Sequence, residues 1–229
     1  MSQFAFPPAP QTGLPIEGED ALFPVRRVYC VGRNFAAHAI EMGHDPDREP
    51  PFFFAKPADA VVPGGADVAY PPRTEDLHYE GELVIALASG GRDMDAAQAE
   101  SAIFGYAIGN DLTRRDMQAE AKSLRRPWDL SKGFEHSAVV GPIHRAQGSA
   151  SVATGRITSH VNGTLRQEGD LSQMIWKVAE IISYLSGSIT LAAGDLIFTG
   201  TPSGVGTLVR GDVVSVEIEG LGRIETPIV

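Results

Sequence analysis

The sequence contains a single cysteine, Cys30, and no apolar run that approaches the roughly 20 residues of a membrane span. One cysteine excludes an internal disulfide framework and any metal site built from several thiolates. The first residues, MSQFAFPPAPQTGLP, have neither the basic start nor the apolar core of a signal peptide. We therefore expect a cytoplasmic protein that does not bind a membrane.

Positive charge is also scarce. The chain has 19 lysines and arginines against 29 acidic residues, which gives a net charge of −10. The basic residues form no stripe, and a negative protein repels the phosphate backbone, so we expect no nucleic-acid partner. A small anionic substrate is compatible with this charge only if basic side chains gather around its binding site.

Glycine and proline, by contrast, are abundant. There are 25 glycines and 16 prolines among 229 residues, more than the average of about 12% for the two together. This composition favours many turns and a β-rich α+β fold over a helix bundle. No repeat or linker divides the chain, so we expect one domain over residues 25–229. The proline-rich residues 1–24 are interpreted as an extended N-terminal arm.

Hydrophobic patterning predicts the main elements of this domain. Short apolar stretches predict strands at 25–32, 50–57, 81–88 and 104–111, and Asn162-Gly163 predicts a hairpin turn. Residues 34–43, 95–103 and 170–186 predict helices, of which the last is the most amphipathic. Residues 113–127 have helical composition but a weak apolar face, so we interpret them as a polar segment.

Two glutamates stand at the beginning of an apolar strand. Glu80 and Glu82 are two residues apart, so their side chains share one face of the strand. Buried together, they would raise each other's pKa and be costly to desolvate. A hard divalent cation between them removes this cost, while a solvated strand edge is the alternative. Asp111, at the end of another apolar strand, favours the cation.

A site of three carboxylates, without thiolates or clustered imidazoles, favours Mg²⁺, Mn²⁺ or Ca²⁺ over zinc. His38 and Glu41 lie three residues apart on a predicted helix, where a carboxylate can orient an imidazole as a general base. An ordinary surface pair is the alternative. The turn at 198–206 is rich in backbone N–H groups and hydroxyls that can hold a carboxylate, and a simple hairpin connection is its alternative.

Together these stretches resemble the fumarylacetoacetate hydrolase family. The resemblance covers residues 25–229 and is carried, in the family's order, by YCVGRNFAAHAIEMG, PFFFAKPADAV, LHYEGELVIAL, IGNDLTRRDMQ, WDLSKGFEHSAVVGP, VNGTLRQEGD and DLIFTGTPSGVG. It implies a mixed β-roll or sandwich with a few short helices, assembled as a homodimer.

The resemblance also assigns roles to individual residues. It implies metal ligands at Glu80, Glu82 and Asp111. It implies catalytic groups at His38, Glu41, Lys132 and Gln118. It implies substrate contacts at Arg115, Thr199, Gly200 and Thr201, to which Arg33 and Lys56 are added because they are basic and close in sequence to these positions.

The implied activity is Mg²⁺-dependent hydrolysis of a carbon–carbon bond in a β-diketo acid, with no organic cofactor. The resemblance is nearest to the fumarylpyruvate hydrolases of gentisate breakdown, which form fumarate and pyruvate. Hydrolysis of other acylpyruvates, decarboxylation of oxaloacetate and isomerisation of a related keto acid are alternatives that use the same site. A non-catalytic domain that binds a small acid or Ca²⁺ is the alternative from a different class.

Overall fold

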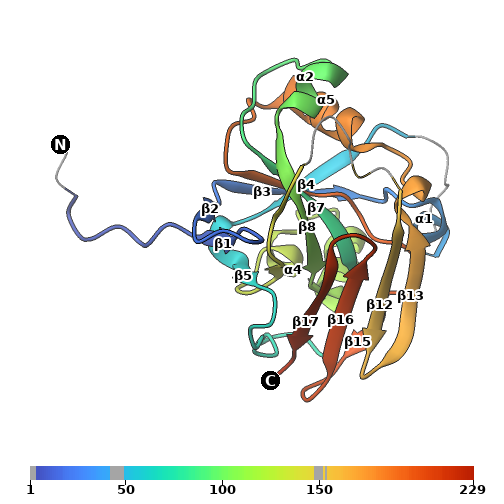
Figure 1. The fold of residues 1–229 in the computed structure, drawn as a ribbon. Helices are drawn as coiled ribbons and strands as arrows, with labels where there is room; N and C mark the ends of the chain where they lie inside the picture. Colours follow the sequence, from blue (N-terminus) through green and yellow to red (C-terminus); the bar gives the residue numbers. More distant parts are fainter. Residues whose placement is uncertain (1–3, 42–48, 147–151, 153) are drawn as a thin grey trace.

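The computed structural model describes residues 4–41, 49–146, 152 and 154–229. Strands dominate this part of the chain and the helices are short (Figure 1), which confirms the expected β-rich fold. The two glutamates lie where two central strands pair antiparallel, β7 (Gly81–Leu87) and β8 (Ile103–Asp111). Every residue of β7 is buried. The apolar stretch that follows the glutamates is therefore interior, as predicted.

The largest sheet has eight strands and is mixed. Its order is β4, β3, β14, β7, β8, β10, β5, and β11 also pairs with β8. The β3–β14 and β5–β10 pairs are parallel, and the remaining pairs are antiparallel. The other strands of this sheet are β3 (Arg27–Gly32), β4 (Phe52–Lys56), β5 (Val61–Pro63), β10 (Ala138–Val140), β11 (His144–Arg145) and β14 (Asp195–Phe198).

A second sheet of four antiparallel strands packs against the first (Figure 1). Its order is β13 (Thr164–Asp170), β12 (Arg156–Val161), β16 (Val213–Ile218), β17 (Gly222–Pro227). Asn162 and Gly163 both have positive φ, 51° and 78°, which confirms the predicted hairpin turn. The two sheets meet at Gly81, where a Cβ would clash with Ser159 and Val216. A glycine between the two glutamates thus lets the sheets approach.

Short elements complete the fold. Two small sheets consist of β1 (Gly13–Pro15) with β2 (Leu22–Pro24), and of β15 (Thr207–Leu208), β6 (Leu77–His78) and β9 (Thr113–Arg114). The helices are α1 (Ala36–Glu41), α2 (Ala96–Ser101), α3 (Arg115–Ser123), α4 (Asp129–Lys132) and α5 (Val178–Ser188), with 3₁₀ turns η1 (Ala58–Ala60) and η2 (Leu171–Gln173). None of the described helices is long and apolar enough to cross a membrane.

The N-terminal segment is partly integrated into the domain. The N-terminal end runs away from the body of the molecule (Figure 1), whereas Gln11 donates to Val25 O, and β1 and β2 form a hairpin whose Leu14 and Phe23 are buried. Both side chains join a core cluster that includes residues of β3, β7 and β14. The proposed division of the chain at residue 24 stays a prediction.

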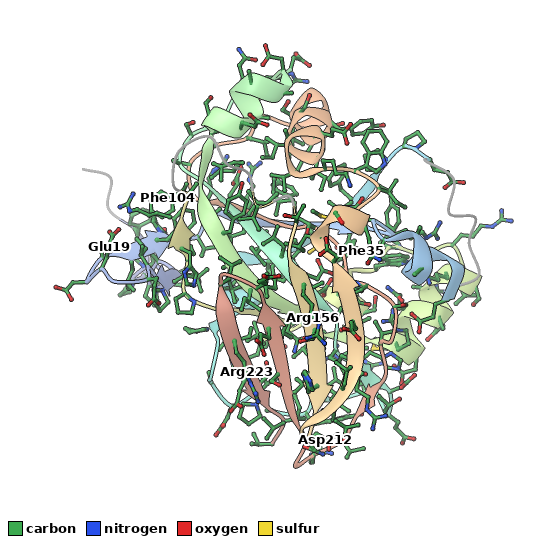
Figure 2. All side chains as sticks on the ribbon, turned by 45° about the vertical axis from the view of Figure 1, so that its right-hand side comes forward. Glu19, Phe35, Phe104, Arg156, Asp212 and Arg223 are labelled. Carbon is green, nitrogen blue, oxygen red and sulfur yellow. The ribbon has the colours of Figure 1, made fainter. Side chains whose placement is uncertain are left out.

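Two predicted segments differ from the structure. The helix expected over 170–186 starts only at Val178, because Met174 forms a bridge with Phe35 and Ile175 donates to the Asn34 carbonyl. Phe35 is labelled in Figure 2. The Asn34 side chain, just before α1, donates to the Trp176 and Thr199 carbonyls and accepts from Trp176 N. Residues 115–123 of the polar segment form α3, which buries Gln118 and Ala121.

Gln167 of β13 connects the two large sheets. Its Oε1 accepts from Gly81 N and Ser159 Oγ at 3.1 and 2.8 Å. Its Nε2 donates to Thr201 Oγ1 and Pro202 O at 2.8 and 2.7 Å. This fully buried amide therefore satisfies both its donors and its acceptor, and it fixes the strand that carries the glutamates relative to the 199–206 loop.

Replacing Gln167 with alanine leaves several buried polar groups without partners. We expect Gln167→Ala to lower the free energy of unfolding by about 2–4 kcal/mol, measured by urea denaturation. Glu168→Ala is the matched control, because this neighbour is exposed and its ion pair with Arg156 is worth about 0–1 kcal/mol. Equal losses in both variants would contradict the connecting role of Gln167.

Candidate active site and metal centre

Three buried carboxylates meet at the end of the β7–β8 pair. Glu80 directly precedes β7, Glu82 is its second residue and Asp111 is the last residue of β8. Asp111 N donates to Glu80 O at 2.8 Å, so the backbone register places these side chains together. One ligand oxygen from each lies within 4.8 Å of the other two. The structure thus brings together the three predicted metal ligands.

The cations around this group are unevenly placed. Lys132 Nζ lies 2.7 Å from Glu80 Oε2 and 2.8 Å from Asp111 Oδ2, and Arg115 Nη2 also donates to Glu80. Glu82 accepts from the Gly200 N–H at 2.7 Å, and no described lysine or arginine forms an ion pair with it. Burial, followed by the charges of Asp111 and Glu80, raises the pKa of Glu82 well above its usual value.

These residues fit a divalent cation. Glu82 is buried without a positive partner in the described chain, which a metal ion would supply. Asp111 Oδ1 is buried and accepts no hydrogen bond from the described residues, although Lys56 Nζ is 2.7 Å away as an ion pair. The carboxylate oxygens are the ligands that hard ions prefer. The group can therefore bind a metal ion, which would supply the positive charge that Glu82 lacks.

Lys132 is held in place by the short helix α4. Its backbone N–H donates to Trp128 O, and its carbonyl accepts from Ser137 Oγ at 2.9 Å and from Lys56 Nζ. Burial by itself lowers the pKa of Lys132, but the charges of Asp111 and Glu80 outweigh burial and raise it. Lys132 is therefore a buried ammonium group that donates to two of the carboxylates.

Arg115 and Gln118 are adjacent on α3. Arg115 Nη1 donates to Gln118 Oε1 at 2.7 Å, and Arg115 Nε donates to His78 Nδ1 at 3.3 Å. His78 in turn is 2.9 Å from Asp76. Because Gln118 Oε1 is engaged by Arg115, its amide N–H groups are the part that can donate to a bound molecule.

The 199–206 loop closes one side of the site. Gly200 has φ +96°, and a Cβ there would lie 2.8 Å from Asn34 Cβ, so glycine is required. Thr199 and Thr201 use their hydroxyls to bond the carbonyls of Leu83 and Gly81. The loop is thereby attached to β7 on both sides of Glu82, which orients the Gly200 N–H toward that carboxylate.

The predicted acid–base pair consists of His38 and Glu41, and the structure describes the side chain of Glu41 only. The carboxylate of Glu41, at the end of α1, accepts from Gly204 N at 3.1 Å and so connects α1 to the 199–206 loop. The backbone of His38 belongs to α1, whereas its side chain lies outside the described part of the structure. Its role as a base stays a prediction.

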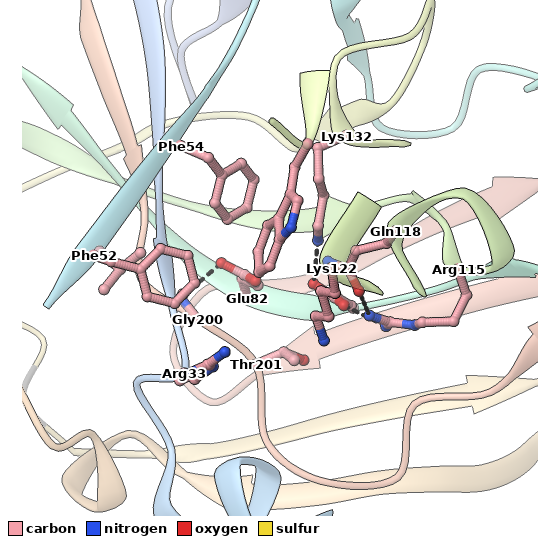
Figure 3. A pocket seen from close by; sticks show the side chains of 14 residues that line it. Arg33, Phe52, Phe54, Glu82, Arg115, Gln118, Lys122, Lys132, Gly200 and Thr201 are labelled. Carbon is pink, nitrogen blue, oxygen red and sulfur yellow. Dashed lines mark hydrogen bonds and ion pairs between the residues drawn. The ribbon is translucent and has the colours of Figure 1, made fainter. Parts of the chain in front are cut away.

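An open cleft leads to these groups (Figure 3). Of the predicted residues, Lys56, Asp111 and Thr199 lie behind the cleft wall, where Lys56 pairs with Asp111 and Thr199 donates to the Leu83 carbonyl. Those that line the cleft are Arg33, Glu80, Glu82, Arg115, Gln118, Lys132, Gly200 and Thr201, together with Val31 and Gly32.

Sequence reasoning missed five side chains of this cleft: Val31, Phe52, Phe54, Lys122 and Trp128. Two of them carried a local signal. Lys122 is four residues after Gln118 on α3, and Trp128 is four residues before Lys132, so each shares a helical face or turn with a predicted residue. Phe52 and Phe54 alternate along β4, where residues two apart share a face.

Comparison with known proteins identifies the family of this chain. A family model described as fumarylacetoacetate (FAA) hydrolase, C-terminal, matches residues 27–229. The chain belongs to the fumarylacetoacetate hydrolase family. A crystal structure of the family's fumarylpyruvate hydrolase from Pseudomonas aeruginosa, in complex with Mn²⁺ and pyruvate, is 50% identical, with a TM-score of 0.96 and 99% of both chains covered.

Two curated relatives differ in the reaction for which they are named. A fumarylpyruvate hydrolase of Ralstonia sp is 44% identical over 80% of this chain and 96% of its own. A mitochondrial oxaloacetate decarboxylase of Dictyostelium discoideum is 38% identical over 86% of this chain and 90% of its own. Both reactions act on 2-oxo acids, so membership of the family does not determine which group the substrate carries beyond its oxo-acid end. The side chains of the cleft determine that group.

Replacing Glu82 with glutamine tests the metal centre. The amide can still accept from Gly200 N–H, but it loses the charge that holds a cation. At about 100 times its Kd, an ion adds about 2.7 kcal/mol of stability, which raises the Tm of a chain of this size by about 5–10 °C. We expect Mg²⁺ or Mn²⁺ to produce this rise in the wild type and not in Glu82→Gln, measured by thermal unfolding.

Glu217→Gln is the matched control, because Glu217 is exposed on β16 and far in sequence from the carboxylate group. It should keep the full rise in Tm. A Glu82→Gln variant that is stabilised by the ion as much as the wild type would refute the assignment of Glu82 as a ligand.

Proposed function

We propose that this chain is a metal-dependent hydrolase that cleaves a carbon–carbon bond in a β-diketo acid, and that it converts 3-fumarylpyruvate and water into fumarate and pyruvate. The observation that carries this proposal is the convergence of Glu80, Glu82 and Asp111 within 4.8 Å beside a cleft lined by basic side chains. The Mn²⁺ and pyruvate named in the Pseudomonas aeruginosa structure support it, because pyruvate is a product of this reaction.

Mg²⁺ is the proposed ion, with Mn²⁺ and Ca²⁺ as replacements, held by the three carboxylates. When bound, the ion supplies a positive charge that orients the oxo-acid end of the substrate and stabilises the enolate that leaves. The buried setting strengthens this interaction, because water does not screen charges there. No organic cofactor is needed, since the reaction is hydrolytic and transfers no electrons to an acceptor.

The remaining steps fall to side chains of the chain itself. His38, oriented by Glu41, is proposed to accept a proton from water, whose oxygen then bonds to the distal carbonyl carbon of the substrate. The bond from this carbon to the neighbouring methylene carbon breaks, and its electron pair becomes the enolate of pyruvate, which takes up a proton. Lys132 Nζ and the Gln118 amide are the proposed donors to the negative charge on the distal oxygen.

Arg115, Gly200 and Thr201 line the cleft and are the proposed contacts of the oxo-acid carboxylate. Lys56 and Thr199, which lie behind the cleft wall, support the reaction by holding Asp111 and the backbone of Leu83. A homodimer, a cytoplasmic location and a place in gentisate breakdown complete the proposal and rest on the family resemblance.

Decarboxylation of oxaloacetate is the second candidate, and the Dictyostelium discoideum relative favours it. That reaction also needs a stabilised enolate, so a metal site formed by Glu80, Glu82 and Asp111 suits both reactions. A water-activating base is needed only for hydrolysis. His38 therefore separates the two reactions.

A panel of substrates tests the proposal directly. The purified chain with Mg²⁺ is given fumarylpyruvate, acetylpyruvate and oxaloacetate in parallel, and pyruvate formation is measured. We expect the highest kcat/KM for fumarylpyruvate, with loss of turnover in EDTA and recovery when Mg²⁺ or Mn²⁺ is restored. A higher kcat/KM for oxaloacetate than for either diketo acid would reject hydrolysis as the main reaction.

Replacing His38 with alanine tests the base. We expect turnover of fumarylpyruvate to fall at least about 100-fold, because a general base contributes that much or more. The rise in Tm caused by Mg²⁺ should remain, since no metal ligand is changed. His160→Ala, on β12, serves as the control and should keep full activity. Normal turnover in His38→Ala would remove His38 from the mechanism.

A further inference from the structure

Two basic side chains in the cleft, Arg33 and Lys122, form no ion pair with the three carboxylates of the proposed metal centre. Arg33 follows β3 and Lys122 belongs to α3. Within the described chain neither side chain has an ion pair or a hydrogen bond, and each lies over an aromatic ring. The Arg33 Cζ is 5.3 Å from the centroid of Phe52, and Lys122 Nζ is 5.4 Å from that of Trp128. These charges are therefore available to a ligand.

The two cations approach the same part of the cleft. Figure 3 shows both on the side of Thr201, away from Phe54. Burial lowers the pKa of Lys122, and the positive charges of Arg115 and Arg33 lower it further. Like charges repel, so holding these cations close together without a bound anion is unfavourable. Their proximity indicates a binding site for a negatively charged group.

The backbone holds Arg33 in an unusual conformation. Its φ is +60°, which costs free energy for any residue other than glycine. The next residue, Asn34, is buried and bonded to Thr199 O at 2.8 Å and to Trp176 N at 2.7 Å. These bonds stabilise the strained conformation and fix the backbone from which the Arg33 side chain enters the cleft. Backbone strain of this kind is typical of functional sites.

Aromatic rings line the space next to these cations. Phe52 and Trp128 meet edge to face with centroids 5.2 Å apart, and Phe54 is 5.6 Å from Trp128. Flat rings give a flat, unsaturated chain an apolar surface, with the cations Arg33 and Lys122 beside it and Lys132 over Phe54. The cleft thus has one basic region next to the carboxylate group and a second at Arg33 and Lys122.

We propose that Arg33 and Lys122 bind the distal carboxylate of the acyl group, while Phe52 and Trp128 pack against its planar chain. The pair would thereby select oxo acids with an acidic acyl group over neutral acylpyruvates. This inference rests on the proposed function and extends it, because it assigns acyl-group specificity to two residues outside the metal centre.

The test compares substrates that differ in this carboxylate. We expect Lys122→Gln and Arg33→Gln each to lower kcat/KM for fumarylpyruvate about 10- to 100-fold, the value of one charge-assisted hydrogen bond. The loss for acetylpyruvate, which has no distal carboxylate, should be much smaller, so the ratio of the two kcat/KM values falls. Arg126→Gln is the control, because Arg126 is exposed and follows the same helix. This substitution removes the same charge outside the cleft.

A binding measurement keeps this inference separate from the hydrolase proposal. Calorimetry of the Mg²⁺-loaded protein compares fumarate with crotonate, which has the same four-carbon chain and one carboxylate. We expect the wild type to prefer fumarate and Lys122→Gln to lose most of that preference. Equal binding of both acids by the wild type would overturn the inference even if hydrolysis is found. The same holds if Lys122→Gln lowers the kcat/KM of both substrates equally, or if Arg126→Gln matches its effect.

Discussion

Three carboxylates buried within 4.8 Å of one another are the constraint on which the rest of the site depends. Like charges in a medium that screens poorly are costly, so the fold must bring cations to them. Lys56, Lys132 and Arg115 reach the group from β4, α4 and α3. All three contact Glu80 or Asp111. Glu82 is left with a backbone N–H, and a bound metal ion would complete the balance on that side.

This arrangement requires precise backbone contacts more than a large number of charged residues. Gly81 allows the four-stranded sheet to approach β7, Gly200 allows the 199–206 loop to approach Asn34, and Gln167 connects the two regions. Gly81 lies between Glu80 and Glu82 in the sequence, Gly200 donates to the Glu82 carboxylate, and Gln167 bonds to Gly81. The high glycine content of the chain therefore has a specific use here: it lets separate backbone segments meet around the charged group.

The sequence allowed prediction of the metal ligands, because the two-residue period of a strand places Glu80 and Glu82 on one face and Asp111 ends a second apolar strand. The structure confirms that these three meet. The start of α5 was predicted wrongly, since contacts between Met174 and Phe35 replace a helical turn that local composition favours. Gln167 gave no chemical signal, because its role arises from neighbours distant in sequence, as in the Gln167–Gly81 hydrogen bond.

The two groups of cations would also allow a protein of net charge −10 to bind the proposed anionic substrate. The cations beside Glu80 and Asp111 are neutralised by these carboxylates and contribute little field beyond the site. Arg33 and Lys122 form no ion pair with the described residues, so their charge acts within the cleft. Overall charge sets the weak repulsion at long range, which salt screens over about 8–10 Å. Recognition of the proposed substrate would then depend on the local charges.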